Sequence, residues 1–172
     1  MAAITTWVIP APKKALVVGV ADMVASNDPS AELVTYSLGS CLGITVHDPV
    51  KKVGGLLHLM LPDSTIDANK AVNAPLMFVD TGVPRLFQAV YNLGGERRRL
   101  IVKAAGGAQF LDAQGVFNIG ERNLASLLRL LGRNGWVLSA QDCGGVSSRT
   151  LRLEMSTGKV TIKSPGAEVY AI

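Results

Sequence analysis

The chain has 172 residues, the size of one domain and enough to bury a core without disulfides or metal ions. Apolar residues make up 48% and charged residues 17%, which excludes an intrinsically disordered chain. The net charge is +4, and the sequence has only one cluster of basic residues, Arg97-Arg98-Arg99, which we interpret as a solvated loop before a strand. Without a basic face, and with 5% aromatic residues for base stacking, we expect no nucleic-acid partner.

The mean hydropathy of +0.31 is high, but the apolar runs are far shorter than the about 20 residues of a membrane helix. Prolines and lysines within residues 10–14 interrupt the N-terminus before a signal-peptide core could form. We therefore expect a cytoplasmic protein without membrane insertion, in which Cys41 and Cys143 form no disulfide. Two cysteines and two histidines are too few, at these spacings, for a structural zinc site.

Short apolar and β-branched runs predict strands in the first part of the chain. Residues 1–13 carry two prolines and no periodicity, so we expect a tail or arm, followed by a single domain over residues 14–172. About five residues around Asp48-Pro49 join two of the strands, which predicts a hairpin. The strands predicted here cover residues 14–21, 33–37, 44–47 and 53–60.

Beyond residue 72 the apolar residues recur at intervals of three and four, which predicts a helix within residues 73–91. Pro84 either starts this helix proper or kinks it. Gly94-Gly95 is expected to end it.

A second helix is predicted over residues 119–133, with Asn118 as its N-cap. Its expected apolar face carries Leu124, Leu127, Leu128 and Leu131. The other predicted strands cover residues 99–105, 136–140, 149–155 and 160–163. The excess of strands over helices predicts a mixed α/β or α+β domain with one large sheet or paired sheets.

Cys41 lies in the segment Gly39-Ser40-Cys41-Leu42-Gly43, where glycines on both sides permit an unusual turn and the close approach of a substrate. Backbone N–H groups beside an exposed thiol could hold an oxyanion. His58 is on the returning strand of the predicted hairpin, so it can lie beside Cys41 and activate the thiol. Thr35, six residues before Cys41, has a hydroxyl that could orient the imidazole.

Other interpretations of these residues stay open at this stage. Cys41 could be a small buried apolar residue, and His58, flanked by leucines, a core histidine with one hydrogen bond. His47 is a rival partner, but its position before Asp48-Pro49 predicts an exposed imidazole. Cys143 is a rival nucleophile with no histidine near it in the sequence.

Six motifs occur in an order that resembles the CheD family of bacterial chemotaxis proteins. They are Thr35-Tyr36-Ser37-Leu38-Gly39-Ser40-Cys41-Leu42-Gly43, Gly54-Gly55-Leu56-Leu57-His58-Leu59-Met60-Leu61-Pro62, Gly106-Gly107-Ala108-Gln109-Phe110, Ile119-Gly120-Glu121-Arg122-Asn123, Asp142-Cys143-Gly144-Gly145 and Thr157-Gly158-Lys159-Val160. The resemblance covers about residues 14–163. The chain departs from the family pattern at Cys143 and at Ser147-Ser148.

The resemblance implies a chemoreceptor glutamine deamidase, a protein-glutamine glutaminase that hydrolyses receptor glutamine side chains to glutamate and ammonia in chemotaxis adaptation. It implies packed mixed β-sheets flanked by helices, similar to the fold of the cytotoxic necrotizing factor toxins. It also implies two partners, the cytoplasmic helices of chemoreceptors and a CheC-type phosphatase.

The resemblance assigns the catalytic positions to Cys41, His58 and Thr35. In this hypothesis Cys41 attacks the amide carbonyl, His58 transfers the protons and Thr35 holds the imidazole. Backbone N–H groups around Gly39, Ser40 and Cys41 hold the oxyanion. No metal or organic cofactor is required. The alternative is a non-catalytic regulator that docks on receptor helices or on CheC, and a third hypothesis is a cysteine peptidase or acyltransferase.

Overall fold

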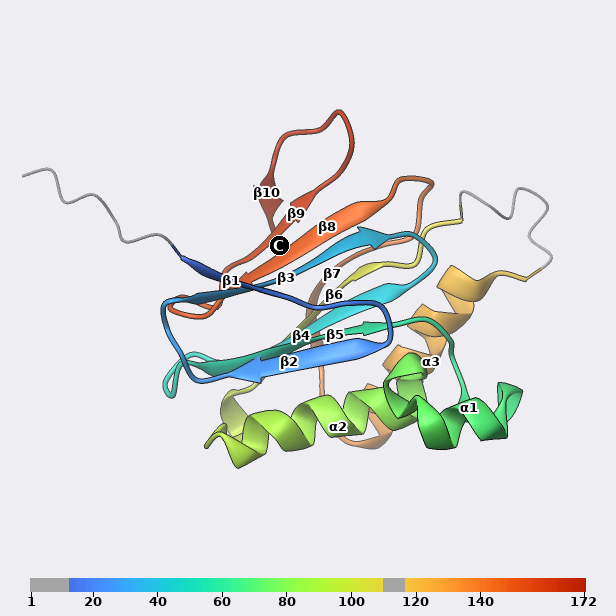
Figure 1. The fold of residues 1–172 in the computed structure, drawn as a ribbon, viewed down its shortest axis with the longest axis horizontal. Coiled ribbons are helices and arrows are strands. Elements are labelled where there is room, and N and C mark those ends of the chain that lie inside the picture. Colours follow the sequence, from blue (N-terminus) through green and yellow to red (C-terminus); the bar gives the residue numbers. More distant parts are fainter. Residues whose placement is uncertain (1–12, 110–116) are drawn as a thin grey trace, which may run out of the picture.

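The computed structural model describes residues 13–109 and 117–172, which form two β-sheets and a layer of helices (Figure 1). The strands are β1 (Lys14–Val17), β2 (Asp22–Ser26), β3 (Ala31–Leu38), β4 (Leu42–Asp48), β5 (Val53–Leu59), β6 (Ile101–Gly106), β7 (Leu138–Cys143), β8 (Arg149–Glu154), β9 (Val160–Lys163) and β10 (Tyr170–Ala171). The helices are α1 (Ala68–Asn73), α2 (Val79–Asn92) and α3 (Ile119–Arg133), with short 3-10 turns η1 (Ser64–Ile66), η2 (Pro75–Met77) and η3 (Arg97–Arg99). The tail predicted for residues 1–13 lies outside the described residues, except for Lys13.

The strands divide between two mixed sheets of five strands each. Sheet A has the order β1-β3-β8-β9-β10, and sheet B has the order β2-β5-β4-β6-β7. In the described residues each sheet has one parallel pair, β1/β3 in sheet A and β6/β7 in sheet B. Figure 1 shows the helices on the far side of sheet B from sheet A. The predicted α+β class with paired sheets is confirmed.

Sheet B is the middle layer, so its central strands are covered on both faces. Every residue of β4 and β5 is buried. In β5, Leu56 belongs to the core between the two sheets, whereas Leu57 and Leu59 belong to the core shared with α2 and α3. A strand that is buried on both faces does not alternate with polar residues, which explains the continuous apolar runs that predicted these strands. Each buried leucine contributes about 1.5–3 kcal/mol to stability.

The predicted hairpin is confirmed: β4 and β5 pair antiparallel from Leu42 opposite Leu59 to Asp48 opposite Val53. The strand predicted over residues 14–21 is wrong in its second half. The chain leaves sheet A after β1, turns through Ala21 with φ of 55°, and enters sheet B as β2. Neither β2 nor the two-residue β10 was predicted, because β2 carries a single β-branched residue and β10 is too short to show a pattern. Both are held by pairing, with β5 and β9 respectively.

The helix predicted within residues 73–91 is confirmed as α2 but begins later than expected, because Asn73 ends α1 and Pro75–Met77 form η2. Helix α2 begins at Val79 and continues through Pro84, and Gly94 follows its end with φ of 96°, as the glycine pair predicted. The second predicted helix is confirmed as α3, although Leu128 on its expected apolar face is 45% exposed. No helix of the described residues is both long and apolar enough to cross a membrane.

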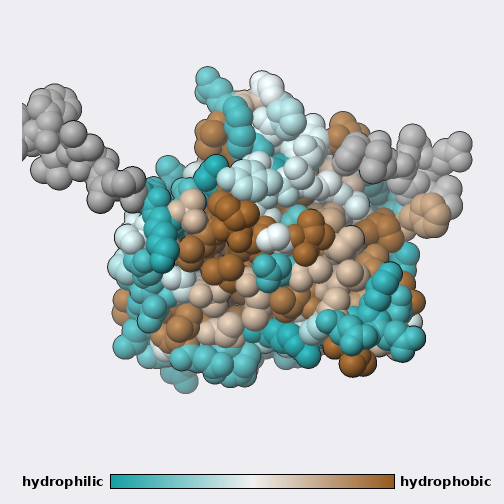
Figure 2. Space-filling view, viewed as in Figure 1, coloured by the Kyte–Doolittle hydropathy of each residue, from teal (hydrophilic) through white to brown (hydrophobic). Residues whose placement is uncertain are grey.

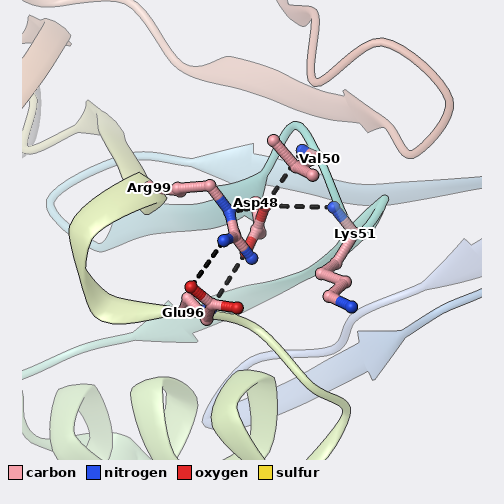
Figure 3. Close-up of polar contacts among 5 residues, drawn as sticks. All are labelled: Asp48, Val50, Lys51, Glu96 and Arg99. Carbon is pink, nitrogen blue, oxygen red and sulfur yellow. Dashed lines mark hydrogen bonds and ion pairs between the residues drawn. The ribbon is translucent and has the colours of Figure 1, made fainter.

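Asp48 ties the β4–β5 turn to the segment before β6 (Figure 3). Its fully buried carboxylate accepts hydrogen bonds from the backbone N–H groups of Val50 (2.9 Å), Lys51 (3.1 Å) and Glu96 (2.9 Å). It also forms an ion pair with Arg99 at 2.8 Å. The interpretation of residues 97–99 as a solvated loop is therefore wrong for Arg99, which faces the buried carboxylate.

Candidate active site

Thr35, Cys41 and His58 come from three segments in about the first third of the chain. Thr35 is on β3 of sheet A, His58 is on β5 of sheet B, and Cys41 lies in the turn that joins β3 to β4. His58 lies two residues beyond Leu56, so it points towards sheet A as Leu56 does. The site therefore lies between the sheets, where the Thr35 hydroxyl reaches the imidazole directly.

The hydrogen bonds of Thr35 determine which nitrogen of His58 carries the proton. The Thr35 hydroxyl donates its single hydrogen to the carbonyl oxygen of Val18 at 2.9 Å. Its contact with His58 Nδ1 at 2.7 Å must then be a bond in which Nδ1–H donates to Thr35 Oγ1. In the neutral ring this leaves a lone pair on Nε2.

His58 Nε2 is buried and has no hydrogen-bond partner among the described residues. An unpaired buried nitrogen costs stability, so a core histidine would be expected to bond at both nitrogens. Burial also lowers the pKa of His58 below its usual value, which keeps the ring neutral near pH 7. An imidazole held in this way can accept a proton at Nε2 from a group that approaches it.

The register of β4 and β5 places Cys41 near that base. Gly43 is opposite His58, and Cys41 is two residues before Gly43, on the same side of the sheet. Such diagonal neighbours have Cα atoms about 7–8 Å apart, within reach of an imidazole and a thiol. Cys41 also packs against the core between the sheets, as expected for this side. Of the three residues that sequence analysis assigned to catalysis, Thr35 and His58 are in direct contact, and the strand register places Cys41 near them without a hydrogen bond to His58.

Burial raises the pKa of the Cys41 thiol, while the thiol's own backbone N–H acts in the opposite direction. With the pKa of His58 lowered by burial, the resting pair is a neutral thiol and a neutral imidazole. Such a pair holds no preformed thiolate near neutral pH.

The carbonyl groups of the turn that carries Cys41 are all held by hydrogen bonds. Ala108 N donates to Gly39 O at 2.7 Å, and Gly107 N donates to Cys41 O at 2.8 Å. Asn123 Nδ2 donates to Ser40 O at 3.0 Å. By contrast, the backbone N–H groups of Ser40 and Cys41 donate to no carbonyl or carboxylate of the described residues. They are two of the groups that sequence analysis assigned to the oxyanion, and they are available to donate hydrogen bonds to one.

The prediction that His47 is exposed is wrong. His47 is 2% exposed, and its Nε2 donates to the carbonyl of Met155 at 3.0 Å, because β8 and the turn after it cover this end of β4. His47 lies six residues from Cys41 along the chain, which corresponds to about 20 Å of strand. It is therefore too far away to be the base for this thiol.

Cys143 lies at the end of β7, opposite Gly106 of β6. It packs against the core on the helix side of sheet B, whereas Cys41 packs against the core between the sheets. Burial raises the pKa of Cys143 to about 11, so this thiol stays protonated near neutral pH. These observations argue against Cys143 as the nucleophile and against a Cys41–Cys143 disulfide within this fold.

Sequence analysis missed three contributors to this site. It gave Val18 no role, although the carbonyl of Val18 orients Thr35. It quoted Gly106-Gly107 only as part of a family motif, whereas a Cβ on Gly106 would lie 2.2 Å from the Cys41 carbonyl oxygen. It quoted Asn123 only as part of a family motif. The glycine pair directly after a strand was the available signal, but its contact across the sheet could not be read from the sequence.

The surface beside the site is partly apolar. Figure 2 shows apolar side chains across the middle of the face on which β1, β2 and their connection lie. Val17 and Val20 of this segment are 58% and 57% exposed. Within the described residues no group of three or more His, Cys, Asp or Glu side chains could hold a metal ion.

Comparison with known proteins shows to which family the chain belongs. The family model described as "CheD chemotactic sensory transduction" matches residues 60–164. A Syntrophus aciditrophicus protein named "Probable chemoreceptor glutamine deamidase CheD 1" is 46% identical over 151 residues, 88% of this chain and 94% of that protein. A Solibacter usitatus protein named "Probable chemoreceptor glutamine deamidase CheD" is 46% identical over 153 residues, 89% of this chain and 90% of that protein. A Clostridium novyi protein with the same name is 39% identical over 158 residues, 90% of this chain and 96% of that protein. With matches of this identity over most of its length, the chain belongs to the CheD family.

Proposed function

We propose that this protein is a chemoreceptor glutamine deamidase that uses Cys41 as its nucleophile, His58 as its general base and acid, and Thr35 as the group that orients the imidazole. Two lines support the proposal: the names of its relatives, and the geometry between the sheets. The observation that carries it is the Val18–Thr35–His58 chain of hydrogen bonds, which leaves His58 Nε2 buried and without a partner among the described residues.

In the first half of the reaction, Cys41 Sγ bonds to the side-chain carbonyl carbon of a substrate glutamine, and the thiol proton passes to His58 Nε2. The carbonyl oxygen becomes an oxyanion, which the N–H groups of Ser40 and Cys41 can stabilise. The tetrahedral intermediate collapses by breaking its C–N bond. His58 Nε2 returns the proton to the leaving nitrogen, so that ammonia departs and a thioester remains on Cys41.

In the second half, water attacks the thioester carbon and His58 Nε2 takes a proton from that water. The C–S bond breaks, the sulfur recovers its proton from His58, and glutamate is released. Thr35 accepts the Nδ1–H bond throughout, so the ring keeps its orientation in both halves. The net change is one water consumed and one ammonia released per glutamine.

The substrates in this proposal are glutamines on the cytoplasmic helices of a chemoreceptor, and the reaction takes place in the cytoplasm. The exposed valines Val17 and Val20 offer apolar contacts for one face of such a helix beside the site. A CheC-type phosphatase is proposed as a second partner on the strength of the family resemblance. Binding of purified CheC to the wild-type protein, measured by calorimetry, tests that partner separately.

The function is tested by incubating a chemoreceptor cytoplasmic fragment from the same source with the wild-type protein and with Cys41→Ala. Peptide mass spectrometry detects conversion of glutamine to glutamate, and an ammonia assay gives the rate. Cys143→Ala is the matched control, because it removes the other cysteine, which the proposed mechanism does not use.

We expect specific glutamines to be converted by the wild-type protein and by Cys143→Ala, and no conversion above background by Cys41→Ala. Full activity in folded Cys41→Ala would remove the nucleophile assignment. Unchanged glutamines with a receptor fragment that binds the wild-type protein would instead support a non-catalytic regulator.

A further inference from the structure

The peptide planes of the nucleophile turn, residues 39–41, are oriented through their carbonyl groups. In a trans peptide the C=O and the following N–H point in opposite directions. The bond that holds Ser40 O therefore also sets the direction of the Cys41 N–H, away from the group that donates to Ser40 O. Asn123 Nδ2 is that group, at 3.0 Å.

Asn123 bridges two segments that carry the reacting groups. Besides Ser40 O, its Nδ2 donates to Met60 O at 2.9 Å, two residues beyond His58. The side chain is fully buried, at 0% exposure. One amide group thus holds the turn that carries the nucleophile and the end of the strand that carries the base.

The start of α3 is built for this close approach. A Cβ on Gly120 would lie 2.2 Å from the carbonyl oxygen of Gly107, so only glycine permits α3 to lie this close to the segment after β6. Asn123 follows one turn later on the same helix. The short approach brings the amide to the turn without a longer, more mobile side chain.

The amide oxygen of Asn123 does not stabilise the fold. Asn123 Oδ1 is buried and has no hydrogen-bond partner among the described residues. A buried acceptor without a partner lowers stability, so this half of the amide works against folding, whereas the donor half pairs two carbonyl groups. The donor half is what the position uses, and its acceptors lie on the segments that carry the reacting groups.

We propose that Asn123 is a positioning residue for the oxyanion: by holding the Ser40 carbonyl, it turns the Cys41 N–H towards the reacting carbonyl group. The inference rests on the proposed deamidase function. The proposed role of Asn123 differs from that of Thr35. Thr35 positions the base, whereas Asn123 positions a donor that stabilises the tetrahedral intermediate.

The test compares two reactions of the same thiol in Asn123→Ala. Deamidation passes through an oxyanion, whereas alkylation of Cys41 by iodoacetamide forms an S–C bond and releases iodide without one. Ser126→Ala is the matched control: Ser126 is on the same helix and donates to Pro62 O at 2.7 Å, near Met60, but it does not bond the nucleophile turn. Mass spectrometry distinguishes alkylation at Cys41 from alkylation at Cys143.

In Asn123→Ala we expect kcat for deamidation to fall by about 10²-fold, the loss associated with one oxyanion donor. The rate constant for alkylation of Cys41 should stay within about threefold of wild type, because that reaction forms no oxyanion. The midpoint of the acid limb of the pH profile should stay at its wild-type value. Ser126→Ala should retain both rates within about threefold.

An equal fall of deamidation and alkylation in Asn123→Ala would show a merely structural role and would overturn the inference, as would an unchanged kcat. If Asn123→Ala does not fold, Asn123→Leu fills nearly the same volume without a donor or a charge, and the same split is expected in the folded protein. Absence of deamidation by the wild-type protein would contradict the proposed function itself, which separates the two failures.

Discussion

The Thr35→Val substitution tests whether the threonine hydroxyl controls the base. Valine has nearly the same shape, but it removes the acceptor of the His58 Nδ1–H bond and the donor to the Val18 carbonyl. Without its acceptor, the Nδ1–H is left buried and the ring is no longer held in the tautomer that has a lone pair at Nε2. We expect a slower reaction from a protein that still folds.

The size of the effect follows from the hydrogen bond that is lost. The bond strengthens when His58 becomes imidazolium, and a hydrogen bond to a charged group contributes about 1.5–3 kcal/mol. Since 1.36 kcal/mol is a factor of ten in rate, kcat should fall roughly 10- to 150-fold. The free energy of unfolding should fall by about 1–2 kcal/mol, because the unpaired polar groups are partly offset by the added apolar contact. For a chain of this length that lowers Tm by roughly 2–8 °C, so the protein stays folded at 25 °C.

The assay is ammonia release from a receptor fragment, with thermal unfolding followed in parallel. Thr35→Ser is the matched control, because serine keeps the hydroxyl that bonds His58 and should retain kcat within about threefold. The reasoning is refuted if folded Thr35→Val turns over at the wild-type rate, or if Thr35→Ser is impaired as strongly as Thr35→Val.

Three further predictions concern the base, the nucleophile turn and the hairpin. Because burial lowers the pKa of His58, the acid limb of kcat/KM against pH should have its midpoint below 6.5; a midpoint at or above 6.5 in a pH–rate profile contradicts this environment. Gly106→Ala should lower the free energy of unfolding by at least about 2 kcal/mol and reduce kcat, since the φ of Gly106 is 113° and an added Cβ would meet the Cys41 carbonyl. Denaturant unfolding and the ammonia assay measure the two effects. Wild-type stability and kcat in this variant would contradict the close packing. Asp48→Asn should cost about 2–4 kcal/mol through loss of the ion pair with Arg99. The pKa of Asp48 is held well below its usual range by that guanidinium and by backbone N–H groups. The contribution of Asp48 to the free energy of unfolding is therefore complete above the unfolded-state pKa of about 3.9 and is lost as the pH falls below that value. Urea unfolding should show a smaller stability difference between Asp48→Asn and wild type at pH 3 than at pH 7.

The elements that sequence analysis predicted well are those whose hydrophobic pattern reflects their own burial. The runs in β4 and β5 are apolar because both faces of these strands are covered, and the three-to-four spacing of Val79, Val83 and Val90 marks the buried face of α2. β2 was missed because its stability comes from pairing with β5 rather than from its own residues. Local patterns report local burial, and an edge strand has little of it.

Local sequence also fails to indicate which polar residues are buried. His47 and Asp48 precede a proline and resemble an exposed turn, yet both are buried, because Met155 and Arg99 come from distant parts of the chain to bond them. Partners separated by 51 to 108 residues in sequence leave no local pattern. Their burial could not be predicted from the residues around them.

The sequence by itself determined the chemistry available to this protein: one thiol between glycines, one histidine on a returning strand and a threonine before them, in an order that resembles the CheD family. Only the tertiary structure decided how these groups act. The Val18 carbonyl makes Thr35 an acceptor for His58, Asn123 reaches the turn from α3, and the two sheets bury the pair so that both are neutral at rest. Tautomer, peptide orientation and pKa depend on atoms that are adjacent in space and distant in sequence, and for that reason they are properties of the fold.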